Sequence, residues 1–499
     1  MRSHLAQRER RYKIHESGAE FSIYEYYHVS GKRRDMWTLT LLTVLLVMSG
    51  CVLAFVLGTG ESYVYMMGHF PAPWGNEIRV GILEGVMAVV FCLIMLLSGA
   101  GGGKNIARDI AETKQNLFYV LVNLMMSSLL ALIYTNDMFT AYVFIEINTI
   151  AAGGLILIRE TGHTLVAATK YMIMSLIGSG LILIGISMLY GITGHLLMSN
   201  MKETVAALNA NGQYTMPLTV VIVLMCVGLA IKSALFPFHS WLPDAYSYGT
   251  ASSSAILSSM VSKSYIFLLL KIFYRVIGID VIETHHVGNL LFVFGVLGMI
   301  LGSIRAIRQV DIRRMIAYSS VAQIGYIYMG IGIGTKTGML AAVFHIISHA
   351  ASKSMLFIAA RGLSEVSDDS KLFEDLKGAG YRNVAAGAGF AVGALSMVGI
   401  PLFAGFTSKV YFAMGALEAG PEKMWVAMIA LAISTVLNAV YFLHTVMTIY
   451  TPAPDKKGRA QNGVPYVAAI LVFIGLNLFL GIGSNLVWEA IAAGVQMFS

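Results

Sequence analysis

The stretch GLAIKSALFPFHSWLPDA, from Gly228 to Ala245, places a lysine and two prolines in the course of an apolar helix. A charge at the centre of a bilayer costs roughly 2.5 to 3.5 kcal/mol on insertion scales, and proline removes a backbone donor and breaks a helix. In a membrane such defects persist only where they are buried in protein or line a water-filled cavity. Lys232, followed by breaks at Pro237 and Pro243, is therefore a candidate element of an ion path.

The composition of the whole chain is that of a polytopic membrane protein. Its 499 residues have a mean hydropathy of +0.72, and 12% of them are charged, against roughly 25% in soluble proteins. The three cysteines, Cys51, Cys92 and Cys226, lie in apolar segments without CxxC or CxxxC spacing. The sequence therefore predicts no disulfide framework, no zinc or iron–sulfur site and no cofactor bound by this chain.

Thirteen apolar segments approach the length of about 20 residues that a membrane span needs. They are residues 37–58, 80–99, 115–134, 137–158, 164–190, 216–236, 250–275, 286–305, 313–333, 337–360, 384–415, 424–450 and 464–485. The sixth and the eleventh contain or adjoin prolines (Pro237, Pro243 and Pro401), so we expect each of them to form two half-helices.

The distribution of lysine and arginine predicts the orientation, because these residues gather on the cytoplasmic side of membrane proteins. If the basic tail, residues 1–35, is cytoplasmic and the spans alternate, most of the 34 basic residues fall on the cytoplasmic side. The net charge of +7 thus reflects topology in a bacterial or archaeal cytoplasmic membrane, and it does not indicate a nucleic-acid partner. The tail could also contact anionic lipid or another subunit.

The interrupted segments also suggest an internal repeat. Residues 115–275 and 286–450 each hold five spans, and in each set the fourth span is the interrupted one. Because five is odd, the second set starts from the opposite side of the membrane, as expected for inverted repeats with discontinuous helices. Residues 36–114 add two helices before the repeats, and residues 464–499 add a C-terminal membrane helix.

Glu146 is central in an apolar segment that carries no basic residue. An isolated buried carboxylate would take up a proton, and Lys232 likewise needs an acid, so a Glu146–Lys232 ion pair is the economical arrangement. A functional role for this pair competes with a static ion pair that only fixes helix packing.

His345 and His349 are four residues apart, so they lie on one helix face, with Lys353 one turn further on. The spacing does not match a metal site, because HIISH lacks the glutamate of the HExxH motif and no third ligand is evident. A proton relay fits better than two packing histidines, since histidine titrates near neutral pH. Lys409 follows the break at Pro401 as a further candidate.

Other ionisable residues within the spans could belong to an ion path, but each also has a simpler, structural interpretation. Lys271 lies near the end of a span, where we expect it to extend to the membrane surface. Glu84 fits an interfacial position equally well, and Lys170 fits a structural ion pair. Lys170, Lys353, His239 and Glu84 are secondary candidates for the ion path.

Several runs resemble one family, the antiporter-like proton-translocating subunits of respiratory complex I, Mrp-type sodium/proton antiporters and membrane-bound hydrogenases. FPFHSWLPDA after a lysine is the most specific of them. The resembling runs are GHFPAPWGNEIRV (68–80), NDMFTAYVFIE (136–146), AATKYMIMSLIGSGLILIGISMLYG (167–191), IKSALFPFHSWLPDA (231–245), IRRMIAYSSVAQIGY (312–326), FHIISHAASKSMLF (344–357) and ALSMVGIPLFAGFTSK (394–409).

The resemblance implies a horizontal proton line across the middle of the membrane. Its members would be the pair Glu146 and Lys232, then Lys263, His349, His345 and Lys409. Two features depart from the family pattern. The usual apolar first helix is missing, because residues 1–35 are polar. The chain also lacks the long lateral helix of the distal complex I subunit, so that identity does not fit.

The sequence therefore predicts a proton-translocating subunit of a multi-subunit energy-converting membrane complex, with no redox chemistry of its own. Its expected partners are other membrane subunits, with iron–sulfur peripheral subunits if the complex is driven by electrons. A stand-alone or Mrp-type cation/proton antiporter without redox coupling is the alternative, and a structural scaffold with inert buried charges is a second. Whether Na⁺ accompanies H⁺, and what drives the complex, stay open.

Overall fold

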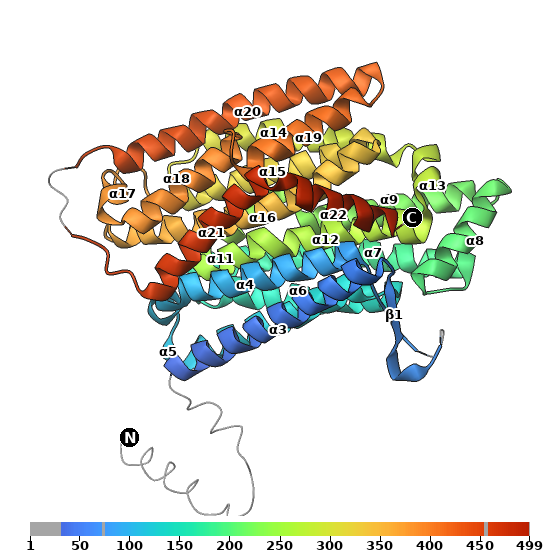
Figure 1. Cartoon of the computed structure of the whole chain (residues 1–499), viewed down its shortest axis with the longest axis horizontal. Helices are drawn as coiled ribbons and strands as arrows, with labels where there is room; N and C mark the ends of the chain where they lie inside the picture. The colour runs from blue at the N-terminus through green and yellow to red at the C-terminus, as the bar shows by residue number, and fades with distance from the viewer. Residues whose placement is uncertain (1–30, 72–74, 454–457, 499) are drawn as a thin grey trace, which may run out of the picture.

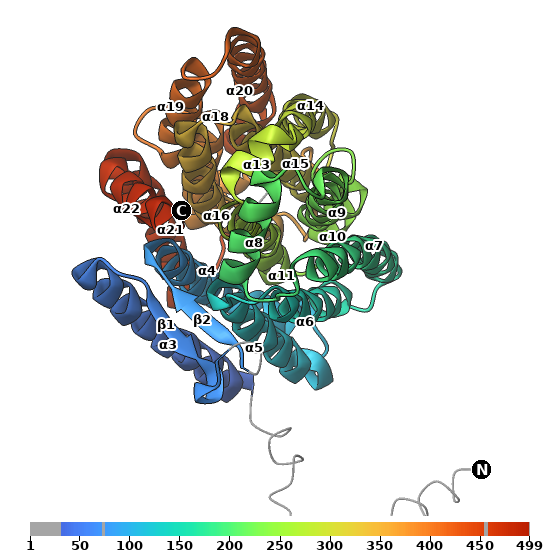
Figure 2. The ribbon, with the colours of Figure 1, turned by 90° about the vertical axis from the view of Figure 1, so that its right-hand side faces the viewer.

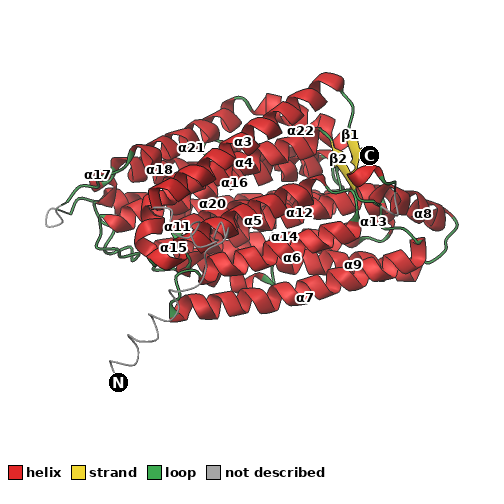
Figure 3. Cartoon of the chain, turned by 90° about the horizontal axis from the view of Figure 1, so that it is seen from below, coloured by secondary structure: helices red, strands yellow, loops and turns green. Residues whose placement is uncertain are grey.

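The computed structural model describes residues 31–71, 75–453 and 458–498, and almost all regular structure within them is helical (Figure 3). Residues 1–30, most of the predicted basic tail, lie outside these ranges. Twelve helices of the described residues are long and apolar enough to cross a membrane. They are α3 (Gly31–Thr59), α4 (Ile82–Asp109), α5 (Glu112–Tyr134), α6 (Met138–Leu157), α7 (Gly162–Thr193), α9 (Thr215–Ser233), the run Ala251–Ile277, α14 (Val287–Ile307), α15 (Ile312–Ile333), α16 (Lys336–Glu365), α20 (Pro421–Tyr450) and α21 (Val464–Ile482).

The remaining predicted segment, residues 384–415, forms two shorter helices, α18 (Val384–Val398) and α19 (Ala404–Leu417). Pro401 lies between them, in a connection where Gly399 has a φ of +89° and Leu402 a φ of +80°. The all-helical polytopic fold expected from the sequence is thereby confirmed. The inverted relation between the two sets of five helices stays a prediction.

The other interruption follows α9. The helix ends at Ser233, and Ala234 has a left-handed φ of +62°. The chain then passes through η2 (His239–Trp241) into α10 (Leu242–Tyr248). Pro237 lies within the break, whereas Pro243 lies in the first turn of α10, where a missing N–H costs nothing.

Two elements that carry candidate residues of the ion path occupy the interior of the bundle. The most apolar stretches of α16 and of the run Ala251–Ile277 are fully buried, whereas that of α3 is only 17% buried. Figure 2 shows α16 in the middle of the bundle and α3 at its edge. The run consists of α11 (Ala251–Ile256), the π-helical turn η3 (Leu257–Val261), α12 (Ser262–Ile272) and a second π-helical turn, η4 (Phe273–Ile277). Charges on these two elements therefore lie inside protein and not in lipid.

Small residues allow the helices to approach closely, as is common in membrane proteins. Helices α14 and α15 meet where Gly325 faces Gly295, and a Cβ on Gly325 would lie 2.6 Å from the Gly295 carbonyl oxygen. Any larger side chain at this contact would force the two helices apart.

The two ends of the bundle differ in structure (Figure 1). One end, called here the β1 end, carries the antiparallel strands β1 (Tyr63–Met66) and β2 (Glu77–Val80) together with α8 (Met198–Ala210) and α13 (Ile279–Thr284). The other, called the α17 end, carries the start of α3 and the short α17 (Ala379–Arg382). Within the last predicted segment, α21 is followed by α22 (Ser484–Gln496).

Candidate functional site

The predicted pair Glu146–Lys232 joins α6 to the end of α9 beside the first break. Lys232 Nζ lies 3.7 Å from Glu146 Oε1 and donates a hydrogen bond to Thr149 Oγ1 over 2.8 Å. Ser179 on α7 donates to the same oxygen of Glu146. Because Thr149 is three residues after Glu146, both side chains lie on one face of α6. Lys232 is fully buried, whereas the Glu146 side chain is 30% exposed.

Glycines hold this pair in a confined space. Gly178 on α7 faces Gly228 on α9, and a Cβ on Gly178 would lie 2.9 Å from the Gly228 oxygen and 3.1 Å from Lys232 Cγ. The backbones of α7 and α9 therefore approach closely at the level of Lys232, which leaves its aliphatic stem little freedom.

Lys263 lies in the fully buried run Ala251–Ile277, directly after the π-helical turn η3. Its Nζ donates to the carbonyl oxygen of Ser258, which belongs to that turn. No carboxylate of the described residues pairs with Lys263. A π-helical turn often marks a functional position because it re-aims the residues that follow. Tyr265, two residues later on the same helix, brings its ring centroid 5.4 Å from Lys232 Nζ.

The two histidines lie on α16 as one stack. The rings of His345 and His349 are 5.9 Å apart and inclined by 18°. Ser408 Oγ on α19 lies 2.9 Å from His345 Nδ1, whereas His345 Nε2 and both ring nitrogens of His349 have no hydrogen-bond partner in the described chain. Lys263 and Lys353 are near enough to His349 to interact with it through the protein interior.

Lys409 lies on α19 beside the second break. Its Nζ donates to the Val398 carbonyl, at the end of α18, over 2.6 Å and to Thr435 Oγ1 over 3.0 Å. The ring of Tyr326 on α15 lies between Lys409 and the histidine stack, with its centroid 5.7 Å from Lys409 Nζ and 5.6 Å from the His345 ring.

The secondary candidates fall into two groups. Lys353 is buried one turn after His349 and donates to the Ile316 carbonyl and to Ser319 Oγ. His239 is buried at the first break, stacked on Phe236. These two residues stay candidates for the path.

Lys170 and Glu84 have local partners of their own. Lys170 is half exposed and forms an ion pair with Asp244 over 2.6 Å. Glu84, in the first turn of α4, is fully buried within the chain. It pairs with Arg275 over 2.5 Å and accepts from the Gly81 N–H at the start of α4.

The prediction that Lys271 extends to the membrane surface is wrong. Its side chain is fully buried, and its Nζ donates to the carbonyl oxygens of Ile133 and Thr135 at the C-terminal end of α5. A cation there satisfies carbonyls that have no partner within the helix. The sequence placed Lys271 near the end of its own span but did not show that a second helix ends beside it.

Replacing Lys271 by methionine should therefore lower the stability of the protein. Two buried carbonyls would lose their donor, and each unsatisfied group costs about 1 to 3 kcal/mol. We expect a lower melting temperature for the purified protein, measured by tryptophan fluorescence. Lys336→Met, exposed at the start of α16, is the control and should melt like the wild type. An unchanged melting temperature for Lys271→Met would show that water satisfies these carbonyls equally well.

Several residues of the site were not predicted from the sequence as functional: Thr149, Ser179, Tyr265, Tyr326 and Ser408. Thr149 could have been found by its helical spacing from Glu146. The others come from neighbouring helices, whose rotation the sequence does not give. Within the described ranges, no group of three or more histidine, cysteine, aspartate or glutamate residues is placed to hold a metal ion.

The sequence signature described as NADH:quinone oxidoreductase/Mrp antiporter, transmembrane, matches residues 135–437. This range contains the site from Glu146 to Lys409. The chain belongs to this family. The resemblance inferred from the sequence runs is thereby confirmed.

Relatives in the family match most of the chain. NADH-quinone oxidoreductase subunit N of Desulforudis audaxviator is 35% identical over 422 residues, which cover 84% of this chain and 81% of that relative. A Na⁺/H⁺ antiporter subunit of Bacillus subtilis is 26% identical over 449 residues, covering 88% and 87%.

Two solved structures share the fold. One is the membrane-bound sulfane sulfur reductase, an archaeal respiratory membrane complex, with a TM-score of 0.84, 24% identity and coverage of 93% of this chain and 92% of that one. The other is the Mrp complex of Dietzia sp. DQ12-45-1b, with a TM-score of 0.83, 21% identity and coverage of 94% and 95%. The relatives that match most of this chain are thus named as subunits of NADH-quinone oxidoreductase and of a Na⁺/H⁺ antiporter.

Proposed function

We propose that this chain moves protons across a bacterial or archaeal cytoplasmic membrane, with its N-terminus on the cytoplasmic side, as one subunit of a multi-subunit energy-converting complex. The observation that carries the proposal is the Glu146–Lys232 ion pair beside a broken helix. It begins a series of amines and imidazoles that continues through the buried Lys263, His349 and His345 to the partly buried Lys409.

The lysines beyond the pair, the buried Lys263 and the partly buried Lys409, suit proton transfer because the described chain offers them no carboxylate. An unpaired charge inside protein is costly, so Lys263 and Lys409 can each hold a proton only while their surroundings favour it. Hydroxyl groups and carbonyls, such as Thr435 and Val398 at Lys409, solvate the charged form without fixing it. Small changes of charge nearby can therefore decide which amine is protonated.

The pair supplies such a change. While Glu146 is ionised and close to Lys232, it favours a proton on Lys232. When a neighbouring charge draws Glu146 away or neutralises it, Lys232 loses this support and its proton can pass toward Lys263. Transfer continues through His349 and His345, whose unpaired ring nitrogens offer positions for bridging water, and ends at Lys409. These sites titrate as a coupled group.

The exposed fraction of Glu146 favours an assembled complex over a stand-alone antiporter. Glu146 lies near the middle of α6, and 30% of its side chain is accessible in the isolated chain. A carboxylate that faced lipid at this depth would be costly, so we propose that another membrane subunit covers it. That neighbour is also the source of the charge change that acts on Glu146.

The energy source is tested by the composition of the complex. We would purify it in mild detergent through a tag on this chain and identify its subunits by intact mass spectrometry. Iron–sulfur subunits that co-purify would establish coupling to redox chemistry. Only small hydrophobic partners would indicate an Mrp-type antiporter, in which Na⁺ is the natural counter-ion to test. A chain that purifies alone and exchanges ions would overturn the proposal of an assembled subunit.

The role of Glu146 is tested by Glu146→Gln in proteoliposomes of the intact complex. The amide keeps the size of the side chain and its contact with Ser179 but removes the charge that supports Lys232. We expect proton transport, followed with a pH-sensitive dye, to fall by about tenfold or more, since one ionic contact to a buried lysine is lost. Glu84→Gln, at the pair with Arg275, is the control for a purely structural ion pair: it should lower stability instead. Normal transport by Glu146→Gln would contradict the mechanism.

A further inference from the structure

A cavity of about 120 Å³ opens at the α17 end of the bundle. Four basic and two acidic side chains and one serine line it: Asp109, Arg159, Arg313, Arg361, Ser364, Asp369 and Lys371. They come from the ends of α4 and α16, the connection between α6 and α7, the start of α15 and the segment that follows α16. The cavity is therefore assembled from both sets of five helices.

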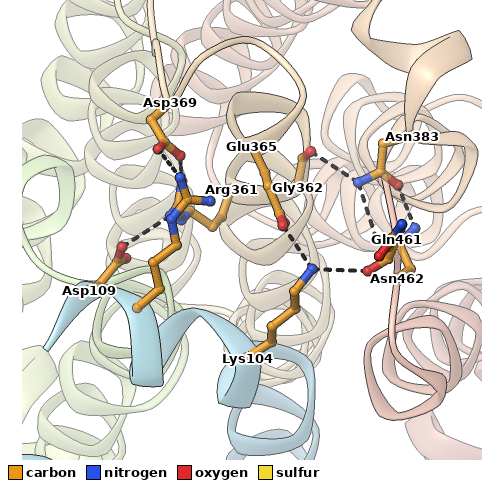
Figure 4. Close-up of polar contacts among 10 residues, drawn as sticks. Lys104, Asp109, Arg361, Gly362, Glu365, Asp369, Asn383, Gln461 and Asn462 are labelled. Carbon is orange, nitrogen blue, oxygen red and sulfur yellow. Dashed lines mark hydrogen bonds and ion pairs between the residues drawn. The ribbon is translucent and has the colours of Figure 1, made fainter. Parts of the chain in front are cut away.

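The two carboxylates of the cavity already have partners. Arg361 donates to Asp109 Oδ1 over 3.0 Å and to Asp369 Oδ1 over 2.6 Å (Figure 4). Asp369 also pairs with Arg108. No carboxylate of the described residues pairs with Arg159, Arg313 or Lys371. Asp311 is nearby, but its Oδ1 accepts from backbone N–H groups at the start of α15. The cavity thus keeps an excess of positive charge.

Part of this charge has a structural role at the first helix break. Arg159, Arg313 and Lys371 donate to the carbonyl oxygens of Tyr248, Gly249 and Ser247 over 3.2, 2.7 and 3.2 Å. These carbonyls stand at the C-terminal end of α10, where cations are favourable. Arg313 Nη2 donates as well to Thr250 O and Ser254 Oγ, so these contacts account for one nitrogen of each cation, while Arg313 Nε stays without a partner in the described chain.

The unused donors are buried and lie around the cavity. Arg313 Nε, Arg361 Nε and Ser364 Oγ have no hydrogen-bond partner in the described chain, and their residues are 2%, 7% and 2% exposed. Buried polar groups are normally hydrogen-bonded. Guanidinium groups match tetrahedral oxyanions well, because their donors form a rigid planar fork.

We propose that this cavity binds a phosphate-type anion, either a free phosphate ion or the phosphate of a lipid headgroup. The space exceeds many times the roughly 10 to 15 Å³ that one water needs, so it can hold one tetrahedral anion. Such an anion would accept from Arg313, Arg361 and Ser364 and would offset the charge of Arg159 and Lys371. It would also join the two sets of helices at the end that the charge distribution predicts to be cytoplasmic.

Binding should weaken as the pH rises through about 8. Burial and the neighbouring Arg313 lower the pKa of Lys371 to about 8. A bound anion stabilises the ammonium form and raises this pKa, so binding above that pH requires uptake of a proton. Below about pH 8 Lys371 is already charged, so its contribution to anion binding does not change with pH. Sulfate, which stays a dianion over this range, is the probe for this measurement.

The proposal is tested on the intact complex by equilibrium dialysis with radiolabelled inorganic phosphate. Ser364→Ala removes a hydroxyl that no group of the described chain uses, so stability should hold while phosphate affinity falls. The double variant Arg159→Gln, Lys371→Gln should lose about tenfold or more in affinity, since two cationic contacts are lost. Lys377→Gln, exposed on the segment after α16 but outside the cavity, is the matched control and should bind normally.

The two possible ligands, free phosphate and a lipid headgroup, are distinguished by measuring the melting temperature of the complex in nanodiscs. If the wild type binds no free phosphate but is stabilised by phosphatidylglycerol over zwitterionic phosphatidylcholine, and the double variant loses this difference, the ligand is a lipid headgroup. If the wild type neither binds phosphate nor distinguishes the two lipids, or if both variants behave like Lys377→Gln, the proposed site does not exist.

Discussion

Lys232→Met should abolish proton transport by the assembled complex. The methionine fills the space of the lysine stem beside Gly178 but cannot carry a proton or attract Glu146. Transfer toward Lys263 then has no first donor. We expect no transport signal above empty proteoliposomes, while a normal subunit composition shows that the complex still assembles.

Stability should fall only moderately in this variant, so that loss of transport can be separated from loss of folding. Removing one partner of a fully buried ion pair costs about 3 to 5 kcal/mol. Glu146 is partly exposed and keeps its contact with Ser179, so it can take up a proton, and we expect a smaller loss of about 1 to 2 kcal/mol. Lys170→Met is the matched control: it also removes a lysine with an acidic partner, Asp244, but should transport normally. Normal transport by an assembled Lys232→Met complex would mean that the pair only fixes helix packing.

The pair itself could be predicted because each member lacked a partner in its own span. A buried carboxylate and a buried amine at similar depth each need an opposite charge, so their pairing can be predicted before the contact between their helices is known. The helix breaks could be predicted as well, because proline acts through its own backbone. Pro243 shows the limit of that argument, since the sequence marked it as part of the break and the structure places it in the first turn of α10.

Contacts between distant helices could not be predicted. Glu84 faces Arg275 from a different span, and the sequence alone did not show this contact. Lys271 was misplaced because the end of α5 lies beside it. Tyr265, which contacts Lys232, and Tyr326, which contacts Lys409 and His345, are ordinary aromatic residues in sequence. Their importance arises only from the rotation of α12 and α15, which depends on the packing of the whole bundle.

The second large effect is expected at the other end of the line. Lys409→Met should stop transport as completely as Lys232→Met, because His345 would then have no amine to receive its proton beyond Tyr326. The aliphatic replacement fills the same space beside Gly399, where an added Cβ would lie 2.9 Å from Lys409 Cδ. Transport is measured as before, with assembly checked by the composition of the purified complex.

A static role for Lys409 makes a different prediction, and Lys423 provides the comparison. Lys409 donates to the Val398 carbonyl at the end of α18, and Lys423 donates similarly to the Gly332 and Ile333 carbonyls at the end of α15. If Lys409 only caps a helix, both methionine variants should show a moderate loss of stability and equal transport. If Lys409 is the last carrier, Lys423→Met should transport normally, whereas Lys409→Met should not. Lys409→Arg sharpens the contrast further, because arginine can donate to both partners but does not release its proton, so it should preserve stability without restoring transport.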